Sequence, residues 1–294
     1  MRTNFLKYYR IRSARAISLF SPSAIWILFF GIAPFGLIVF YSFLVAKEWG
    51  GIKYVLTINN YIDLIKPQYF RVLLNSIMLG GLSTIICLIL GYPLAYWLTF
   101  YLKKKLLTLF LFLITIPIWI AYVMRAYSWM FLLDDNGVVN NLLMSLNFIN
   151  NPISLLYNNF AVVLGLIYCY LPFMILPLYT SLDRLNFDLL EAAADIGANP
   201  IQRFLKITLP LTKGGVMSGI VLVFAPSVGN YVIPALMGGA RVPMIAPLLR
   251  RKFLVYRDWP FGAVLALLIA GITIAILVTA IRIAGGEEIY EELA

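Results

Sequence analysis

Side chains that could carry out acid–base or nucleophilic chemistry are nearly absent from the apolar parts of this sequence. The 294 residues include no histidine, which excludes His-based catalytic triads, HExxH zinc sites and histidine-ligated haem. The two cysteines, Cys87 and Cys169, both lie in apolar runs, where thiols usually act as small hydrophobic groups. The sequence therefore predicts a protein with no catalytic residues, no metal site and no cofactor.

Polar chemistry concentrates instead in one segment, residues 183–210. Asp188 and Glu191 are three residues apart, a spacing typical of a capping box that opens a helix. Asn199 and Pro200 end that helix, because proline disfavours helical geometry in the residue before it, and a second short helix follows. One face of the first helix collects Leu189, Leu190, Ala193, Ala194 and Gly197. The segment therefore predicts a bent pair of short amphipathic helices.

The elements that must position this segment are long apolar runs. Hydrophobic residues make up 62% of the chain and charged residues only 12%, against about a quarter in soluble domains. A helix needs about 20 mostly apolar residues to cross the hydrocarbon core of a membrane. The segments that satisfy this length are 24–46, 75–101, 106–133, 161–181, 215–237 and 262–284. We therefore expect an all-α integral membrane protein, built as a bundle of six transmembrane helices.

Basic residues indicate how this bundle is oriented. Five of them and no acidic residue precede the first span, which is too long for a signal peptide. Lys103, Lys104 and Lys105 follow the second span, whereas the basic segment 241–257 opposes the resulting orientation. We expect cytoplasmic N- and C-termini and a cytoplasmic loop at 183–210. The predicted parts are a basic N-terminal segment (1–23), a transmembrane domain (24–284) and an acidic cytoplasmic tail (285–294).

Within the 183–210 loop, one set of residues has a longer and more specific spacing: Glu191, Ala192, Ala193, Gly197, Ile207, Leu209 and Pro210. This pattern resembles the EAA loop of ATP-binding-cassette (ABC) importer permeases. The resemblance implies that the loop is a coupling helix that docks on an ATPase subunit and switches the bundle between outward and inward access. It also implies that Gly197 does not tolerate a bulky substitution, because a side chain there would separate the two surfaces. The chain has no G-x-x-x-x-G-K-[ST] phosphate loop, so ATP hydrolysis is assigned to a separate chain.

Segments 125–129, 136–142, 171–182, 226–234 and 257–263 resemble the permease subunits of spermidine/putrescine importers. This resemblance implies a polyamine permease in the inner membrane of a bacterium, with no nucleic-acid partner. The implied partners are cytoplasmic ABC ATPase subunits, a second permease subunit and a periplasmic or extracellular solute-binding protein. Importers of opines and other small organic solutes share much of this pattern and remain the alternative.

A polyamine is a flexible polycation, so its route should offer carbonyl groups, carboxylates and aromatic faces. Carboxylates are missing from the predicted spans, and Asn230 stands where many polyamine permeases carry an acidic residue. Arg125, at the outer end of the third span, is expected to extend to the membrane interface. The candidates for the substrate path are Tyr127, Trp129, Tyr168, Tyr170, Asn230 and Tyr231.

Two other classes of membrane protein compete with this interpretation. An ion-coupled secondary transporter would need ionisable groups near the bilayer midplane. An intramembrane protease or transferase would need a nucleophile with a base, or a pair of carboxylates. The near absence of charged residues from the predicted spans disfavours both classes.

Overall fold

The computed structural model describes residues 21–23 and 25–291, with side chains described up to Ile283. Most of the predicted basic segment 1–23 and the last three residues of the predicted tail lie outside the described residues. The chain divides into two compact units, Met1–Leu64 with Lys252–Leu268, and Ile65–Arg251 with Ile269–Ala294.

The first unit contains a helix over Ser21–Ser42, which includes η1 (Leu28–Ile32) and α2 (Ala33–Ser42). An antiparallel hairpin of β1 (Leu44–Ala46) and β2 (Ile52–Leu56) follows, and then α3 (Asn59–Leu64). Asn60 Nδ2 donates to the carbonyl oxygens of Ser42 and Leu44 at 2.9 and 2.8 Å, at the point where the helix ends.

The prediction that the first span continues to residue 46 is therefore wrong, because β1 begins at Leu44. The hairpin turn contains Gly50 and Gly51, whose φ angles are 90° and 97°. A Gly-Gly pair between two apolar runs is a known signal of a hairpin, and the sequence interpretation missed it.

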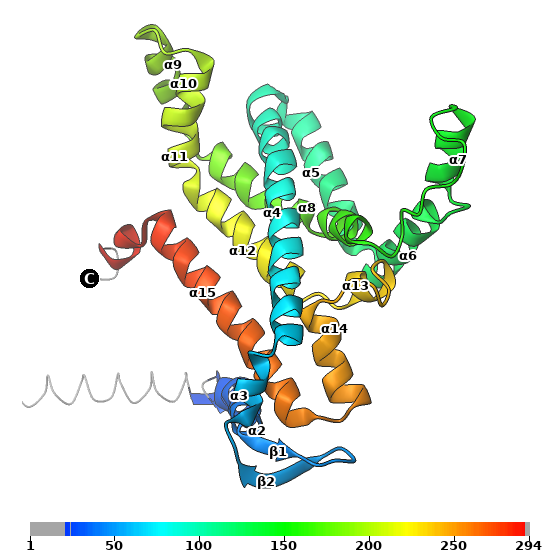
Figure 1. Ribbon diagram of the computed structural model, residues 1–294. Helices are drawn as coiled ribbons and strands as arrows, with labels where there is room; N and C mark the ends of the chain where they lie inside the picture. The colour runs from blue at the N-terminus through cyan, green and yellow to red at the C-terminus, as the bar shows by residue number, and fades with distance from the viewer. Residues whose placement is uncertain (1–20, 24, 292–294) are drawn as a thin grey trace, which may run out of the picture. The chain divides into compact units, whose positions relative to one another are not determined.

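The second unit is built on α4 (Pro67–Tyr101), α8 (Asn159–Asp183) and α12 (Lys213–Val228), which pack against one another (Figure 1). Glycines allow the close approach. A Cβ placed on Gly91 of α4 would lie 3.1 Å from Met174 Cγ of α8. One placed on Gly215 of α12 would lie 2.4 Å from Ser181 Cβ of α8. Small residues at helix contacts are typical of membrane bundles, where packing rather than water exclusion holds helices together.

The predicted third span, 106–133, is not one continuous helix. It consists of α5 (Lys104–Trp119) and α6 (Tyr122–Leu133), and α6 is followed by α7 (Val138–Ser145). The two parts meet at an angle of 93°. Ile120 and Ala121 are extended, with ψ angles of 132° and 133°, and the Ile120 N–H turns back to the Pro117 carbonyl oxygen.

The predicted fifth span, 215–237, is also interrupted. α12 ends at Val228, and α13 (Val232–Leu236) and α14 (Ile245–Arg250) follow as separate short helices. Asn230 Oδ1 accepts the Ile233 N–H at 3.0 Å, so this side chain satisfies the start of α13.

The loop before α12 contains α9 (Phe187–Asp195), α10 (Pro200–Arg203), η2 (Phe204–Thr208) and α11 (Leu209–Leu211). Helix Pro200–Leu211 meets α12 at an angle of 65°.

Four helices in the described part of the chain are long and apolar enough to cross a membrane: Ser21–Ser42, Pro67–Tyr101, Asn159–Asp183 and Trp259–Ile283. The count rises to six if the two bent helix pairs are each one span. The last helix, α15 (Trp259–Glu291), continues beyond residue 285, where the predicted tail begins. The all-α membrane fold is confirmed, with one small hairpin added to it.

Candidate functional site

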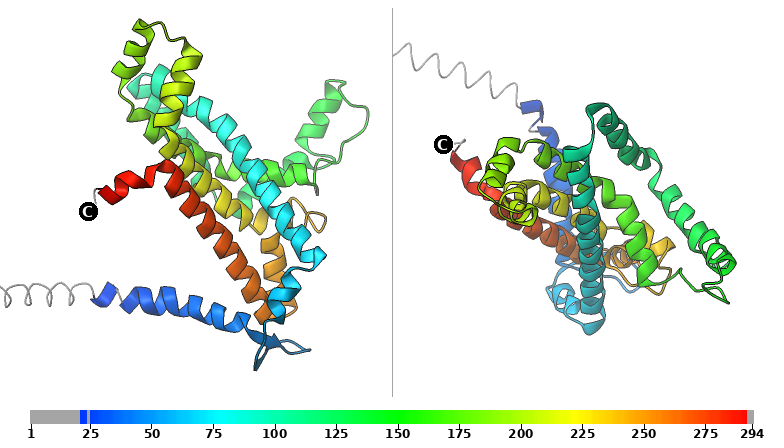
Figure 2. Two further views of the ribbon diagram at one scale, coloured as in Figure 1. Left: turned by 60° about the vertical axis from the view of Figure 1, so that its left-hand side comes forward. Right: turned by 90° about the horizontal axis from the view of Figure 1, so that it is seen from above.

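The predicted coupling loop extends past the end of α12, near the turn that joins α4 to α5 (Figure 1, Figure 2). Between residues 188 and 210, only Ala193 and Thr208 are buried. Of the predicted coupling residues, Ile207 is half-buried, and those that are exposed are Glu191, Ala192, Gly197, Leu209 and Pro210. The loop therefore has a free surface that is available to another protein.

The first helix of the loop begins differently from the prediction. Asn186 is the N-cap of α9, and its Oδ1 accepts the backbone N–H of Asp188 at 3.0 Å. The predicted capping box of Asp188 with Glu191 is therefore wrong, because the Asn186 amide already occupies the capping position. Among the described residues, Glu191 has no hydrogen-bond or ion-pair partner. Its carboxylate is free for a contact outside the chain.

Gly197 ends α9 in a left-handed conformation, with φ of 86°. The Gly197 N–H donates to Ala194 O and the Ala198 N–H donates to Ala193 O, both at 2.9 Å. These two bonds form a Schellman motif, whose central residue is usually glycine because a Cβ is unfavourable there. A Cβ built on Gly197 would meet nothing within 4 Å. The chain thus needs glycine for its backbone here, and the space beyond it is open.

The second corner of the loop is a capping box. The Gln202 N–H donates to Asn199 Oδ1 at 2.8 Å, and the Asn199 N–H donates to Gln202 Oε1 at 3.0 Å. Pro200 opens α10, so the predicted break at this point is confirmed.

Apolar side chains are displayed along the loop. Ile196 is 86% exposed and Ile201 is 70% exposed, and Leu205 is exposed as well. Such a group of exposed apolar residues is typical of a protein interaction surface. Phe204, between Ile201 and Leu205 in the chain, turns inward and is half-buried.

A second candidate region is a polar cluster between α6, α8 and the break after α12. Asn230 Nδ2 donates to the hydroxyls of Tyr122 and Tyr170. Tyr170 Oη donates in turn to Pro226 O at 3.3 Å. Because Asn230 Oδ1 also accepts the Ile233 N–H, the amide of Asn230 is fully used within the chain. Tyr122 was not a candidate from the sequence, since nothing distinguished it from other span tyrosines.

Arg125 lies beside this cluster and does not extend to the membrane interface as predicted. Its side chain is only 7% exposed. The guanidinium lies over the Tyr122 ring, 5.0 Å from the ring centre, and donates to Cys169 O at 3.4 Å. No carboxylate among the described residues pairs with it. The prediction is wrong because α6 turns away from α5 and packs against α8, which carries Arg125 into the protein.

The six predicted substrate-path residues do not form one site. Tyr170 and Asn230 are joined in the cluster, and Trp129 packs edge to face with Tyr168 at 5.5 Å. Tyr127 is 52% exposed, apart from both pairs. The remaining candidate, Tyr231, lies under the guanidinium of Arg250 at 5.6 Å.

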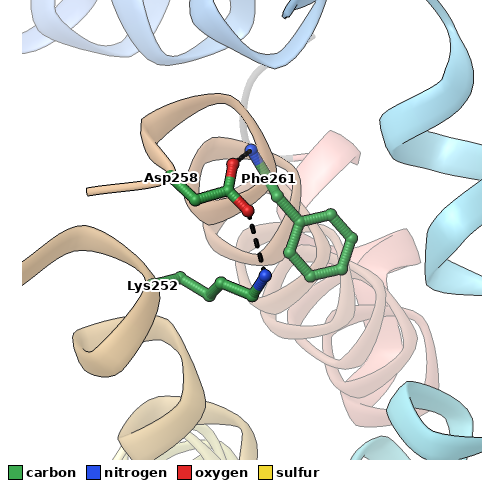
Figure 3. Close-up of polar contacts among 3 residues, drawn as sticks. All are labelled: Lys252, Asp258 and Phe261. Carbon is green, nitrogen blue, oxygen red and sulfur yellow. Dashed lines mark hydrogen bonds and ion pairs between the residues drawn. The ribbon is translucent and has the colours of Figure 1, made fainter. Parts of the chain in front are cut away.

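The charge of the basic segment 241–257 is partly neutralised by an ion pair within the first unit. Lys252 Nζ lies 2.9 Å from Asp258 Oδ2 and 4.6 Å from the centre of the Phe261 ring (Figure 3). Asp258 Oδ1 accepts the Phe261 N–H at 3.2 Å and so caps the start of α15. One of the basic charges in this segment is therefore satisfied internally.

The polar cluster leads to a prediction about Asn230. We expect Asn230→Ala to lower the free energy of unfolding by about 2–3 kcal/mol, because the bond to the Ile233 N–H and the bonds to two tyrosine hydroxyls are lost together. Asn230→Asp keeps an oxygen for the Ile233 N–H but has no N–H to donate to the two hydroxyls and buries a carboxyl group, so it should be destabilised as well. Thermal unfolding of the purified variants in detergent measures the difference. Equal melting temperatures for Asn230→Ala and the wild type would show that the hydrogen bonds of this polar cluster do not stabilise the protein.

Comparison with known families matches residues 87–283 to the family described as "Binding-protein-dependent transport system inner membrane component". The chain is 38% identical to the spermidine/putrescine transport system permease protein PotB of Haemophilus influenzae, over 82% of this chain and 84% of that protein. It is 40% identical to PotB of Escherichia coli, over 81% of this chain and 86% of the relative. The inner membrane ABC transporter permease protein YdcU of Escherichia coli is 31% identical over 72% of both chains.

Solved structures show the same fold. A chain of a bacterial ABC transporter involved in the import of the acidic polysaccharide alginate superposes with a TM-score of 0.73. That superposition covers 95% of this chain and 98% of the other, at 18% sequence identity. The methionine ABC transporter MetNI gives a TM-score of 0.56, at 14% identity over 75% of this chain and 98% of the other.

Proposed function

This chain belongs to the family of inner membrane components of binding-protein-dependent transport systems, and we propose that the solute it carries is a polyamine of the spermidine or putrescine type. As a member of that family it is a permease subunit of an ABC importer. The observation that supports the polyamine is the 38–40% identity with spermidine/putrescine permeases over more than four-fifths of the chain. Family membership favours ATP-driven import over ion-coupled transport.

The coupling role of the loop is part of this proposal. The surface that docks on the ATPase would be formed by Glu191, Ala192, Gly197, Ile207, Leu209 and Pro210, whereas Ala193 of the predicted set is buried. Support comes from the free carboxylate of Glu191, the open space beyond Gly197 and the exposed apolar side chains around them. Docking of an ATPase requires that the loop faces the cytoplasm, which sets both chain termini on the same side for six spans.

The complete importer would contain a second permease subunit, two ATPase subunits and a solute-binding protein outside the membrane. One structure with this fold, of a bacterial alginate transporter, was solved in complex with its ligand-bound periplasmic protein. In the proposed assembly residues 24–284 form the transmembrane domain, and the part of the basic segment 241–257 that is not paired internally faces outward.

The route of the solute would use hydroxyls and aromatic faces rather than carboxylates. Tyr127, Trp129 and Tyr168 present rings that can bind an ammonium group through cation–π contacts, whereas the Tyr231 ring already has the Arg250 guanidinium over it. Tyr170 and Asn230 would shape the route by holding α6, α8 and α12 together, since their polar groups already bond to one another.

Uptake by proteoliposomes tests this function. The permease is reconstituted with its ATPases and second permease subunit, and the solute-binding protein is added outside. We expect ATP-dependent accumulation of labelled putrescine or spermidine, with little effect of an excess of opine-like compounds. Accumulation of an opine-like compound in place of both polyamines would overturn the polyamine proposal, whereas import of any of them without ATP would contradict the family function.

A further inference from the structure

The C-terminal part of α4 carries aromatic residues that contact both helices of the coupling loop. The Phe100 ring packs edge to face with Phe187 of α9 at 5.0 Å. The Phe204 ring of η2 packs edge to face against Tyr92 at 5.4 Å and against Tyr96 at 6.2 Å. These three aromatic residues of α4 lie four positions apart, so they form one stripe along the helix. The loop therefore rests on α4 at its first helix and again at its second.

A buried hydrogen bond reinforces the second contact. Tyr92 Oη lies 2.7 Å from Thr212 Oγ1, and Thr212 is fully buried. The Thr212 hydroxyl donates to Thr208 O at 2.8 Å, so the Tyr92 hydroxyl must donate to Thr212. Thr212 lies between Pro200–Leu211 and α12, where the chain bends by 65°. This bond thus ties α4 to the bend between the loop and the bundle.

The backbone on each side of this contact is unusual. Phe204 opens a π-helical turn, Phe204–Thr208, and such turns often mark functional positions because they shift the direction of the following side chains. On α4, Gly91 packs tightly against Met174 of α8, and Pro93 lacks the N–H that would complete the helix ladder. Tyr92 therefore lies between a close packing point and a weakened turn of α4.

From this juxtaposition we propose that Phe204, Thr212 and Tyr92 form the joint that transmits movement of the coupling loop to α4. Each is a positioning residue that acts through the helices and does not touch ATP or the solute. When the ATPases move the loop, the Phe204 ring and the Tyr92–Thr212 bond would carry α4 with it. The loop is covalently joined to α8 at its start and to α12 at its end, and the aromatic stripe attaches it to α4 as well. This inference rests on the proposed coupling function.

The test uses Tyr92→Phe and Thr212→Val in the reconstituted importer, since each removes one partner of the bond and retains most of the side-chain volume. We expect the stimulation of ATP hydrolysis by loaded binding protein, relative to the basal rate, to fall about fivefold, together with uptake. The double variant should be no worse than either single variant, because all three lack the same bond. Copurification of the ATPase should be unaffected.

Thr84→Val is the matched control. Thr84 is a buried threonine of α4 whose hydroxyl donates to Gly80 O at 2.7 Å, four residues back, as that of Thr212 does to Thr208 O. It has no bond to the loop, so its variant should keep full stimulation. If Thr84→Val reduces stimulation as much as Thr212→Val does, the effect is general packing and the proposal is wrong.

Phe204 provides an independent measurement. Phe204→Leu keeps an apolar side chain but loses the edge-to-face contacts, and Phe204→Tyr keeps the ring. We expect uptake to fall in the first variant and to be largely retained in the second. Wild-type stimulation in Tyr92→Phe and Phe204→Leu would refute the joint. That result would not contradict the proposed coupling function. Docking is tested separately, by whether variants of the exposed loop residues still copurify with the ATPase.

Discussion

Replacing Gly197 with valine should reduce uptake by the reconstituted importer by about tenfold or more while the protein still inserts in the membrane. A β-branched residue at a φ of 86° is strained by roughly 1–3 kcal/mol. Its side chain would also fill the open space where the ATPase is proposed to dock. ATP-dependent uptake and copurification of the ATPase measure the two consequences.

Gly51→Val separates backbone strain from loss of docking. Gly51 has a similar φ, 97°, with nothing within 4 Å of a Cβ, and it lies in the hairpin of the first unit. Gly197→Asn supplies the complementary control, because asparagine tolerates the left-handed region but still adds bulk. We expect normal ATPase copurification for Gly51→Val and impaired copurification for Gly197→Asn. Wild-type uptake by Gly197→Asn would show that glycine is needed only for the backbone.

The second large effect is expected at the contact between α8 and α12. A Cβ on Gly215 would lie 2.4 Å from Ser181 Cβ and 2.9 Å from the Pro177 carbonyl oxygen. The carbonyl belongs to the backbone of α8 and cannot rotate away, so the helices must separate. We expect Gly215→Ala to destabilise the protein by about 3 kcal/mol, at the upper end of overpacking effects. The melting temperature in detergent and the yield of folded protein measure this loss.

Gly214 offers a control one residue away. A Cβ on Gly214 meets nothing within 4 Å, and alanine is a better helix former than glycine. Gly214→Ala should therefore be as stable as the wild type or slightly more stable. If both variants melt at the same temperature, the close approach of α8 and α12 at Gly215 does not exist in the protein.

The sequence alone predicted correctly those properties that depend on composition or on residues close together in the chain. The apolar runs predicted a helical membrane protein, and the spacing of the residues from Glu191 to Pro210 indicated the importer family. Asn199 and Pro200 predicted the corner of the loop, because capping and proline geometry are decided within a few residues.

Local patterns also misled where two signals competed. Asp188 and Glu191 have the spacing of a capping box, but Asn186, two residues before Asp188, is the N-cap and accepts the Asp188 N–H. The spans 106–133 and 215–237 are mostly apolar, yet the helix breaks in both, since hydropathy does not record where a helix ladder ends.

Only the tertiary structure decided which side chains meet. Arg125 is buried and donates to Cys169 O of α8 because the chain bends by 93° after α5, and no pattern in the sequence encodes that angle. Tyr92 and Thr212 are separated by 120 positions, and Tyr122 and Asn230 by 108. Such pairs form when α4, α6, α8 and α12 pack through their small residues, so their contacts follow from helix packing rather than from chain order. For this permease, the local sequence specified the helices and the corners of the 183–210 loop, and packing specified which helices that loop contacts.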